Sequence, residues 1–269
     1  MFGQMVVLEG VTAAAAPGAP RINMNAPDII ATKIASLKHA LGAREILPAP
    51  GGGVVGRCRW TGAPLTSKGT SANTLTLSEI AGRSALSING SGRAGLALPP
   101  GSLTSSYTMI AAVYLAAADL AGNYITNVLS GFDSSDAYIS ALQRAYGATS
   151  AGANAGKLIS SPLAGGNFPS ASLPAPGWAV LVADYDNSSR LVSVSINQVS
   201  SFGTLTLPGT FVPPSGSYVE VGYHLDPSSL RNSSLGDLYT FSDSLLKTDL
   251  GKSQLAELVA AMKTYYAIA

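Results

Sequence analysis

The stretch PGWAVLVADYDNSSRLVSVSINQ, residues 176–198, decides the fold of this chain. An apolar run that begins at Trp178 ends in the polar turn DNSS, residues 186–189, and a second apolar and alternating run follows over residues 191–196. Two short valine-rich runs on either side of a polar turn predict two neighbouring antiparallel strands. The segment therefore indicates a protein built from β-hairpins.

The rest of the chain continues this pattern of short strands with glycine, proline or asparagine between them, which is typical of a β-sandwich. Residues 107–117, YTMIAAVYLAA, predict a central strand buried on both faces. Asn89-Gly90 predicts a hairpin turn between two of the strands. The expected strands cover residues 74–77, 84–89, 94–98, 107–117, 124–129, 137–142, 157–160, 178–185, 191–196, 204–207, 218–223 and 238–241.

Two segments have helical spacing instead. The closing segment has one apolar face, and Thr248 or Asp249 is expected to cap its start. That face comprises Leu250 or Leu255, then Leu258, Val259, Met262 and Tyr265. Near the start of the chain, the spacing of Ile30, Ile34, Leu37 and Leu41 predicts a helix of about four turns that begins at Pro27 and stops before Gly42.

These elements predict three parts of the chain. Residues 1–57 are expected to form an arm, the first helix and a Gly/Pro-rich linker, used for attachment or oligomerisation. Residues 58–81 connect this part to a β domain over residues 82–269.

The composition excludes several classes of partner. Only 12% of the 269 residues are charged and the net charge is +1, without a charged run, so nucleic acid is not expected as a partner. No apolar stretch approaches the roughly 18 residues of a membrane span, so no membrane insertion is expected. Cys58 is the only cysteine, which excludes an intrachain disulfide, and it is expected to be a small buried residue.

Several segments, taken in order, resemble laminin-G-like, concanavalin-A-like jelly-roll domains of the lectin and glucanase type. They are ALSINGSGRAGLALPP, SYTMIAAVYLA, WAVLVADYDNSS and GDLYTFSDSLLKTDLGKSQLAEL, within residues 82–269. The pattern departs from the family where Gln198, after Asn197, replaces the glycine of a hairpin. The resemblance implies an all-β, antiparallel two-sheet jelly-roll sandwich with a C-terminal helix, to which this chain adds an N-terminal arm and helix.

Domains that the chain resembles occur in surface proteins of bacteriophage virions, in adhesins and in sugar-binding modules. Low charge, a single cysteine, an N-terminus without the positive region of a signal peptide, and the N-terminal arm favour the virion case. We therefore expect a non-catalytic virion structural protein, a fibre, spike or capsid decoration, that attaches to surfaces or host glycans. It would be made in the host cytoplasm and released by lysis.

Residues 1–57 would then contact other virion proteins or join copies of the chain into a homo-oligomer, with a trimer favoured. The alternative is a carbohydrate-binding module of a cellular adhesin or secreted glycosidase.

Catalysis is not expected. A retaining glycosidase needs two carboxyl groups about 5 Å apart, and the five glutamates are scattered along the chain. Asp184 and Asp186 alternate, but they adjoin a predicted turn. No Gly-x-Ser-x-Gly turn accompanies the two histidines, and His39 is expected on the face of the first helix.

Sugar binding requires aromatic rings near polar side chains at the rim of the sandwich. Tyr138, Tyr223, His224 and Arg231 lie in or beside predicted loops and are the candidate ligand-binding residues. Calcium is the one metal weighed, because it prefers several loop oxygens. Its candidate ligands are Asp133, Asp136 and Asp226, although DSSD at residues 133–136 is also a good polar turn and is favoured as one. No other cofactor is expected.

Overall fold

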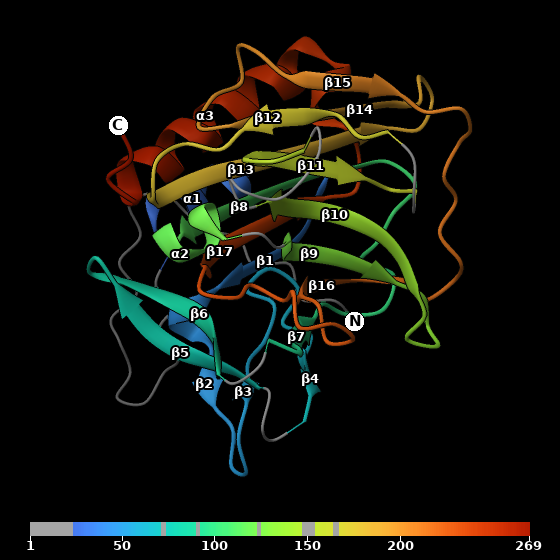
Figure 1. The fold of residues 1–269 in the computed structure, drawn as a ribbon. Coiled ribbons are helices and arrows are strands. Elements are labelled where there is room, and N and C mark those ends of the chain that lie inside the picture. Colours follow the sequence, from blue (N-terminus) through green and yellow to red (C-terminus); the bar gives the residue numbers. More distant parts are fainter. Residues whose placement is uncertain (1–23, 71–73, 90–91, 123–124, 147–153, 164–166) are drawn as a thin grey trace, which may run out of the picture.

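The chain forms a sandwich of two antiparallel sheets, which confirms the predicted all-β fold (Figure 1). The structure, a computed structural model, describes residues 24–70, 74–89, 92–122, 125–146, 154–163 and 167–269. Within these residues every predicted strand is present, with ends that differ by a few residues. Residues 1–23, the predicted arm, lie outside the described part.

The larger sheet has eight strands in the order β15-β14-β13-β8-β17-β6-β5, and β1 also pairs with β17. Its strands are β1 (Leu37–Gly42), β5 (Thr74–Ile80), β6 (Arg83–Asn89), β8 (Tyr107–Leu115), β13 (Gly177–Asp186), β14 (Leu191–Ile196), β15 (Gly203–Thr206) and β17 (Ser234–Phe241). The segment that decided the fold is the β13–β14 hairpin, in which Leu181 lies opposite Ile196 and Asp186 opposite Leu191.

The smaller sheet has seven strands in the order β12-β11-β10-β9-β16-β7-β4. They are β4 (Thr66–Gly69), β7 (Ala94–Ala97), β9 (Ile125–Phe132), β10 (Tyr138–Tyr146), β11 (Lys157–Ser161), β12 (Ser170–Ser172) and β16 (Tyr218–Gly222). A separate hairpin joins β2 (Leu47–Pro48) and β3 (Val54–Val55) and projects from the body of the molecule (Figure 1).

Strand β8 lies between β13 and β17 and is buried on both faces, as predicted. Met109, Ala111 and Val113 belong to the core between the two sheets. Ile110 and Ala112 point the opposite way, into a second apolar layer beneath the C-terminal helix. Because both faces are covered, the strand needs no polar alternation.

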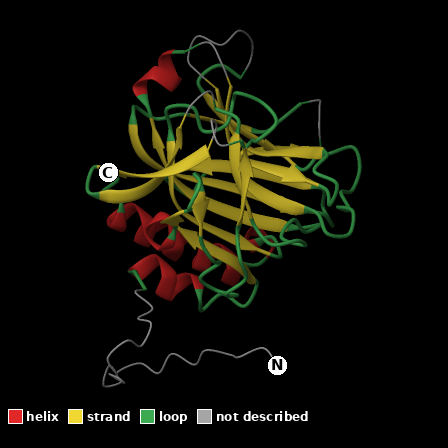
Figure 2. Cartoon of the chain, turned by 90° about the horizontal axis from the view of Figure 1, so that it is seen from below, coloured by secondary structure: helices red, strands yellow, loops and turns green. Residues whose placement is uncertain are grey.

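The helices are α1 (Ala26–Ala31), α2 (Ala117–Ala121) and α3 (Asp249–Tyr265), with short 3-10 helices η1 (Ala43–Glu45) and η2 (Leu245–Lys247). Figure 2 shows most of the helical ribbon on one side of the strands. Thr248 caps α3 by accepting a hydrogen bond from the backbone N–H of Gly251, as predicted. Leu255, not Leu250, lies on the buried face, since Leu250 is 69% exposed. No helix among the described residues is long and apolar enough to cross a membrane.

The predicted first helix is wrong beyond Ala31. Residues 37–42 form β1, which pairs with β17 in the larger sheet. Leu37 faces the layer beneath α3 and Leu41 faces the core between the sheets, so apolar residues occur on both sides of this strand. In such a strand apolar and polar residues do not alternate, so the spacing of its apolar residues can match that of a helix. His39 is consequently a buried strand residue and does not lie on a helix.

The predicted hairpin at Asn89-Gly90 is also wrong, because β6 and β7 belong to different sheets. The hairpin joins β5 to β6 through Ala81 and Gly82, which have φ values of 49° and 71°. Two consecutive positive φ angles are those of the turn type that matches the twist of paired strands. Gly90 itself lies outside the described residues.

The divisions predicted at residues 57 and 81 do not coincide with a break in the sheets. Strands β1 and β5 belong to the larger sheet and β4 belongs to the smaller one. Ile46, Val54 and Cys58 are buried in the same core as the later strands. Burial of Cys58 as a small core residue is confirmed.

Candidate functional site

Three of the four predicted ligand-binding residues meet on the outer face of the smaller sheet. Phe132 of β9 lies directly opposite Tyr138 of β10 and Tyr218 of β16. Residues opposite one another project from the same face of a sheet. Val219 and Val221, the alternate residues of β16, point into the core, so Phe132 and its partners project outward.

These rings form an aromatic cluster, defined as Phe132, Tyr138, Tyr218, Tyr223 and His224. The ring centroid of Phe132 lies 5.6 Å from that of Tyr218, 5.9 Å from that of Tyr138 and 4.9 Å from that of His224. The centroids of Tyr138 and Tyr223 are 5.1 Å apart. Phe132 is fully buried, whereas Tyr138 and Tyr223 are only partly buried. The cluster is therefore a set of packed rings in which Phe132 is buried and parts of the Tyr138 and Tyr223 rings are exposed.

A glycine turn brings Tyr223 and His224 over this face. Gly222 ends β16 with a φ of 83°, in the left-handed region that glycine tolerates best. A Cβ atom at this position would also meet the carbonyl oxygen of Ala94 at 2.8 Å. After the turn, the backbone N–H of Tyr223 donates to the hydroxyl oxygen of Ser229 at 2.9 Å. The turn thus directs both side chains toward Phe132.

A buried carboxylate orients His224. Glu220 is fully buried and accepts a hydrogen bond from the backbone N–H of His224 at 2.8 Å, and its other oxygen is 2.7 Å from Nδ1 of the same residue. An ionised carboxylate only accepts hydrogen bonds, so Nδ1 of His224 is the donor in this contact. Gly95 makes room for this carboxylate, which occupies the space that a Cβ atom would need.

A second polar group borders the cluster. Nζ of Lys68 lies 2.9 and 2.8 Å from the two carboxylate oxygens of Asp136, and the hydroxyl of Tyr218 donates to Asp136 at 2.6 Å. The hydrogen bonds from Lys68 and Tyr218 lower the pKa of Asp136 and keep it ionised. Nζ of Lys68 also lies 5.3 Å from the ring centroid of Tyr218.

The predicted calcium ligands do not form a ligand set. Asp133 accepts hydrogen bonds from the backbone N–H groups of Ser135 and Ala137, which is the polar turn weighed as the alternative. Asp226 makes a similar turn with Ser228, and Asp136 binds the Lys68 ammonium. Within the described residues no group of three or more histidine, cysteine, aspartate or glutamate side chains is placed to hold a metal ion.

Arg231 is not part of the cluster. Its Nε donates to the carbonyl oxygen of Ile125 at 3.0 Å, at the opposite end of β9 from Phe132. These two positions are seven residue steps apart along the strand, which is about 23 Å at roughly 3.3 Å per residue.

Sequence reasoning also missed Phe132, Tyr218, Glu220 and Lys68. The alternation of Tyr218 and Glu220 with two core valines was a signal that could have identified two of them.

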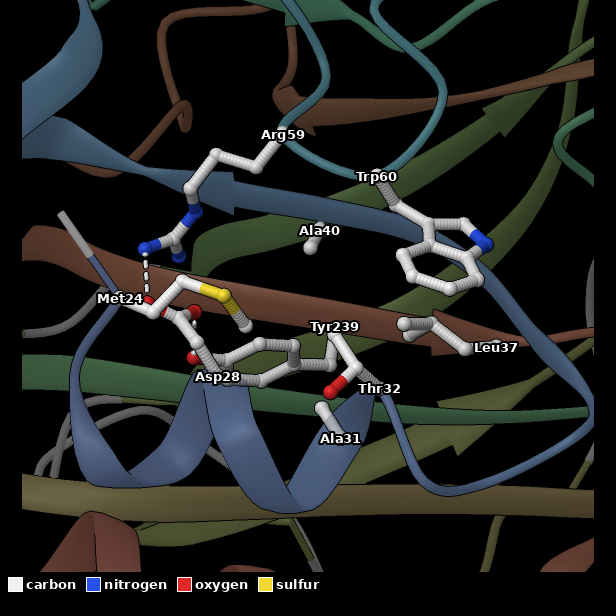
Figure 3. A pocket seen from close by; sticks show the side chains of 9 residues that line it. All are labelled: Met24, Asp28, Ala31, Thr32, Leu37, Ala40, Arg59, Trp60 and Tyr239. Atoms are coloured by element: carbon white, nitrogen blue, oxygen red, sulfur yellow. Dashed lines mark hydrogen bonds and ion pairs between the residues drawn. The ribbon is translucent and has the colours of Figure 1, made fainter. Parts of the chain in front are cut away.

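Two hollows lie elsewhere, near the N-terminal part of the described chain. The first has room for about one water molecule, with about 20 Å³ of accessible volume. In its wall the carboxylate of Asp28 accepts hydrogen bonds from Arg59 and Tyr239, whose side chains also line the hollow (Figure 3). Arg44, outside the hollow, also donates to Asp28. Asp28 is buried, so this arrangement is an internal ion-pair network that holds α1 against β17.

The second hollow is an open groove of about 840 Å³ beside the β2–β3 hairpin. Arg44, Glu45, Arg57 and Pro64 are among its lining residues.

No protein-family model matches the sequence, and comparison with curated protein sequences finds no relative. Solved structures are similar in fold. Trypanosoma rangeli sialidase in complex with sialic acid matches with a TM-score of 0.57 and 12% identity, over 86% of this chain and 33% of the sialidase. This chain thus spans about a third of the sialidase.

Domain 4 of AbnA, a GH43 extracellular arabinanase from Geobacillus stearothermophilus, in complex with arabinotriose, matches with a TM-score of 0.55 and 17% identity. The match covers 83% of this chain and 98% of that domain. The binding domain of botulinum neurotoxin DC in complex with SialylT matches with a TM-score of 0.51 and 10% identity, over 87% of this chain and 52% of that one. At these identities the likeness establishes the β-sandwich fold.

Proposed function

We propose that this chain is a non-catalytic glycan-binding module and that the aromatic cluster is its binding face. The observation that carries the proposal is the pair of partly exposed rings, Tyr138 and Tyr223, above the buried ring of Phe132. Sugar sites combine apolar stacking surfaces with a few fixed polar groups. Here the polar groups are His224, oriented by Glu220, and Asp136.

The structural comparisons support this proposal at the level of the fold. The arabinanase domain was solved with arabinotriose and matches over nearly its whole length. The toxin domain was likewise solved with SialylT. A shared fold does not carry a site from one protein to another, so the binding face is argued from the side chains of this chain alone.

The arrangement of carboxylates favours binding over hydrolysis. Glu220 is held by two hydrogen bonds from His224, and Asp136 is held by Lys68 and Tyr218. Glycoside hydrolysis needs one carboxyl group as a proton donor and a second as a nucleophile or base. We propose that bound glycans are released unchanged.

The test is calorimetric binding to a panel of oligosaccharides with the wild type, Tyr138→Ala and Tyr223→Ala. Loss of a stacking ring should weaken binding about tenfold, which corresponds to roughly 1.4 kcal/mol. Tyr265→Ala is the matched control, because Tyr265 is a partly buried tyrosine on α3. Equal affinities for all four proteins, or no binding by the folded wild type, would contradict the proposal.

We also propose that the β2–β3 hairpin contacts a second copy of the chain, which is the oligomerisation role among those predicted for residues 1–57. Leu47 and Val55 lie opposite each other across the hairpin, are 63% and 45% exposed, and line the groove of about 840 Å³. Light scattering should show an oligomer that Leu47→Asp dissociates. A wild type that stays monomeric at high concentration would refute this proposal.

Display on a bacteriophage virion is a proposal supported by the composition and by the arm that the sequence predicts at the N-terminal end. Mass spectrometry of purified particles tests it, and absence of the chain from particles would contradict it.

A further inference from the structure

We propose that the aromatic cluster selects uncharged sugars and discriminates against sugars that carry a carboxylate. This inference rests on the proposed glycan-binding function and names the class of ligand.

Three carboxylates surround the cluster and one ammonium opposes them. Asp136 binds the hydroxyl of Tyr218, Glu220 binds His224, and Asp133 follows Phe132 directly in the chain. Lys68 is the cation whose ion pair the structure places here, and its pair with Asp136 cancels one negative charge. Among the described side chains around the cluster, the three carboxylates therefore outnumber the one ammonium.

The electrostatic field at Tyr218 agrees with this excess of carboxylates. Burial is the largest cause of the raised pKa of Tyr218, and the hydrogen bond to Asp136 adds to it. The negative charges of Glu220, Asp136 and Asp133 raise the pKa further. A phenol that is hard to ionise marks a place where additional negative charge is unfavourable.

The exposed carboxylate of the cluster only accepts hydrogen bonds. Asp136 is kept ionised and 46% of its side-chain surface is exposed, so it offers acceptor oxygens to a ligand. Sugar hydroxyls can donate to these oxygens. A sugar carboxylate has no proton to donate at neutral pH, so it would bring an acceptor against acceptors and a negative charge against negative charges.

Two cations, Lys68 and Arg231, could have favoured an acidic sugar by pairing with its carboxylate. The structure supports this role for neither of them. Lys68 already contacts both oxygens of Asp136, so its charge is neutralised. Arg231, the other cation predicted for this site, lies at the far end of β9 and donates to Ile125. The likeness to proteins solved with sialic acid or SialylT therefore does not extend to the choice of ligand.

The experiment measures binding of the full chain to matched pairs of sugars by calorimetry. The pairs are galactobiose with digalacturonate and lactose with 3′-sialyllactose. Asp136→Asn and Lys68→Met change the charge of the cluster in opposite directions. Asp249→Asn is the control, because the Asp249 side chain is 98% exposed at the start of α3.

The neutral member of a pair should bind at least about fivefold tighter in low salt, and added salt should reduce this ratio. Asp136→Asn should lower the ratio severalfold, Lys68→Met should raise it, and Asp249→Asn should leave it unchanged. Tighter binding of the acidic member, weakened by Tyr223→Ala, would overturn this inference while the glycan-binding function stands. Failure of every sugar to bind would overturn both.

Discussion

The two outer faces of the sandwich both carry apolar and aromatic side chains, but they differ in how far these side chains are buried. Over the larger sheet, α3 buries Leu258, Val259 and Met262 against the strands. Over the smaller sheet, the aromatic cluster leaves Tyr138 and Tyr223 partly exposed. One face is covered by the chain itself, and the other leaves parts of two tyrosine rings exposed.

The ion pairs of the two faces show the same contrast. Asp28 and Asp237, beside α1 and β17, have only 4% of their side-chain surface exposed and share Arg59 between them. Asp136, which pairs with Lys68 beside the aromatic cluster, has 46% exposed. Charges removed from water must be matched or the fold loses stability, whereas a partly exposed ion pair contributes little to stability.

The largest expected effect is on the covered face. Arg59→Ala leaves Asp28 and Asp237 buried without their shared cation, and it should lower the free energy of unfolding by about 3–5 kcal/mol. Chemical denaturation measures this loss. Arg57→Ala is the control, because Arg57 is exposed. An unchanged denaturation midpoint for Arg59→Ala would show that water reaches the network and that the two faces do not differ.

Two buried groups of the larger sheet predict opposing pH effects. Burial, aided by Lys38, lowers the pKa of His39 to about 4, and burial raises the pKa of Asp184 to about 6. The unfolded chain protonates His39 below a pH of about 6.5, so stability from His39 is lost as pH falls from there toward 4. Folded Asp184 retains its proton longer than unfolded Asp184, so its contribution is lost as pH rises from about 4 to 6.

Each contribution is roughly 3 kcal/mol, and in the wild type they largely cancel. In His39→Leu the stability should therefore fall as pH rises from about 4 to 6. In Asp184→Asn it should instead rise from about pH 4 to neutrality. Urea denaturation across this range measures both slopes. Identical slopes of stability against pH in the wild type, His39→Leu and Asp184→Asn would contradict the prediction of opposing pH effects.

A smaller effect is expected at the start of α3. Thr248→Ala removes the hydrogen bond to the backbone N–H of Gly251 and should cost about 1 kcal/mol. Thermal unfolding measures the change. Ser253→Ala, an exposed position inside the same helix, should have little effect. Equal melting temperatures for Thr248→Ala and the wild type would mean that tertiary packing alone holds this end of the helix.

The smallest effect on stability is expected on the open face. Lys68→Ala removes a cation, as Arg59→Ala does, but its pair with Asp136 is partly exposed and should contribute at most about 1 kcal/mol. Denaturation under the conditions used for Arg59→Ala gives a direct comparison of the faces. A loss as large as that of Arg59→Ala would mean that the open face is also closed to water.

Sequence reasoning located part of the candidate site. Tyr138, Tyr223 and His224 lie beside local turn signals at strand ends, and such ends meet at the rim of a sandwich. Lys68 and Phe132 carry no local signal, because they reach the site through the pairing of β4 with β7 and of β9 with β10 and β16. Asp226 satisfies its own turn, which composition does not distinguish from a metal ligand.

By itself the sequence determined twelve of the strands, the cap of the last helix and the sandwich class, because these depend on local periodicity and turn chemistry. Tertiary structure decided the fate of residues 37–42, whose apolar pattern suits a helix but whose pairing with β17 makes a strand covered on both faces. It also decided which face stays open. Burial depends on contacts between residues far apart in the chain, and no local pattern encodes those contacts.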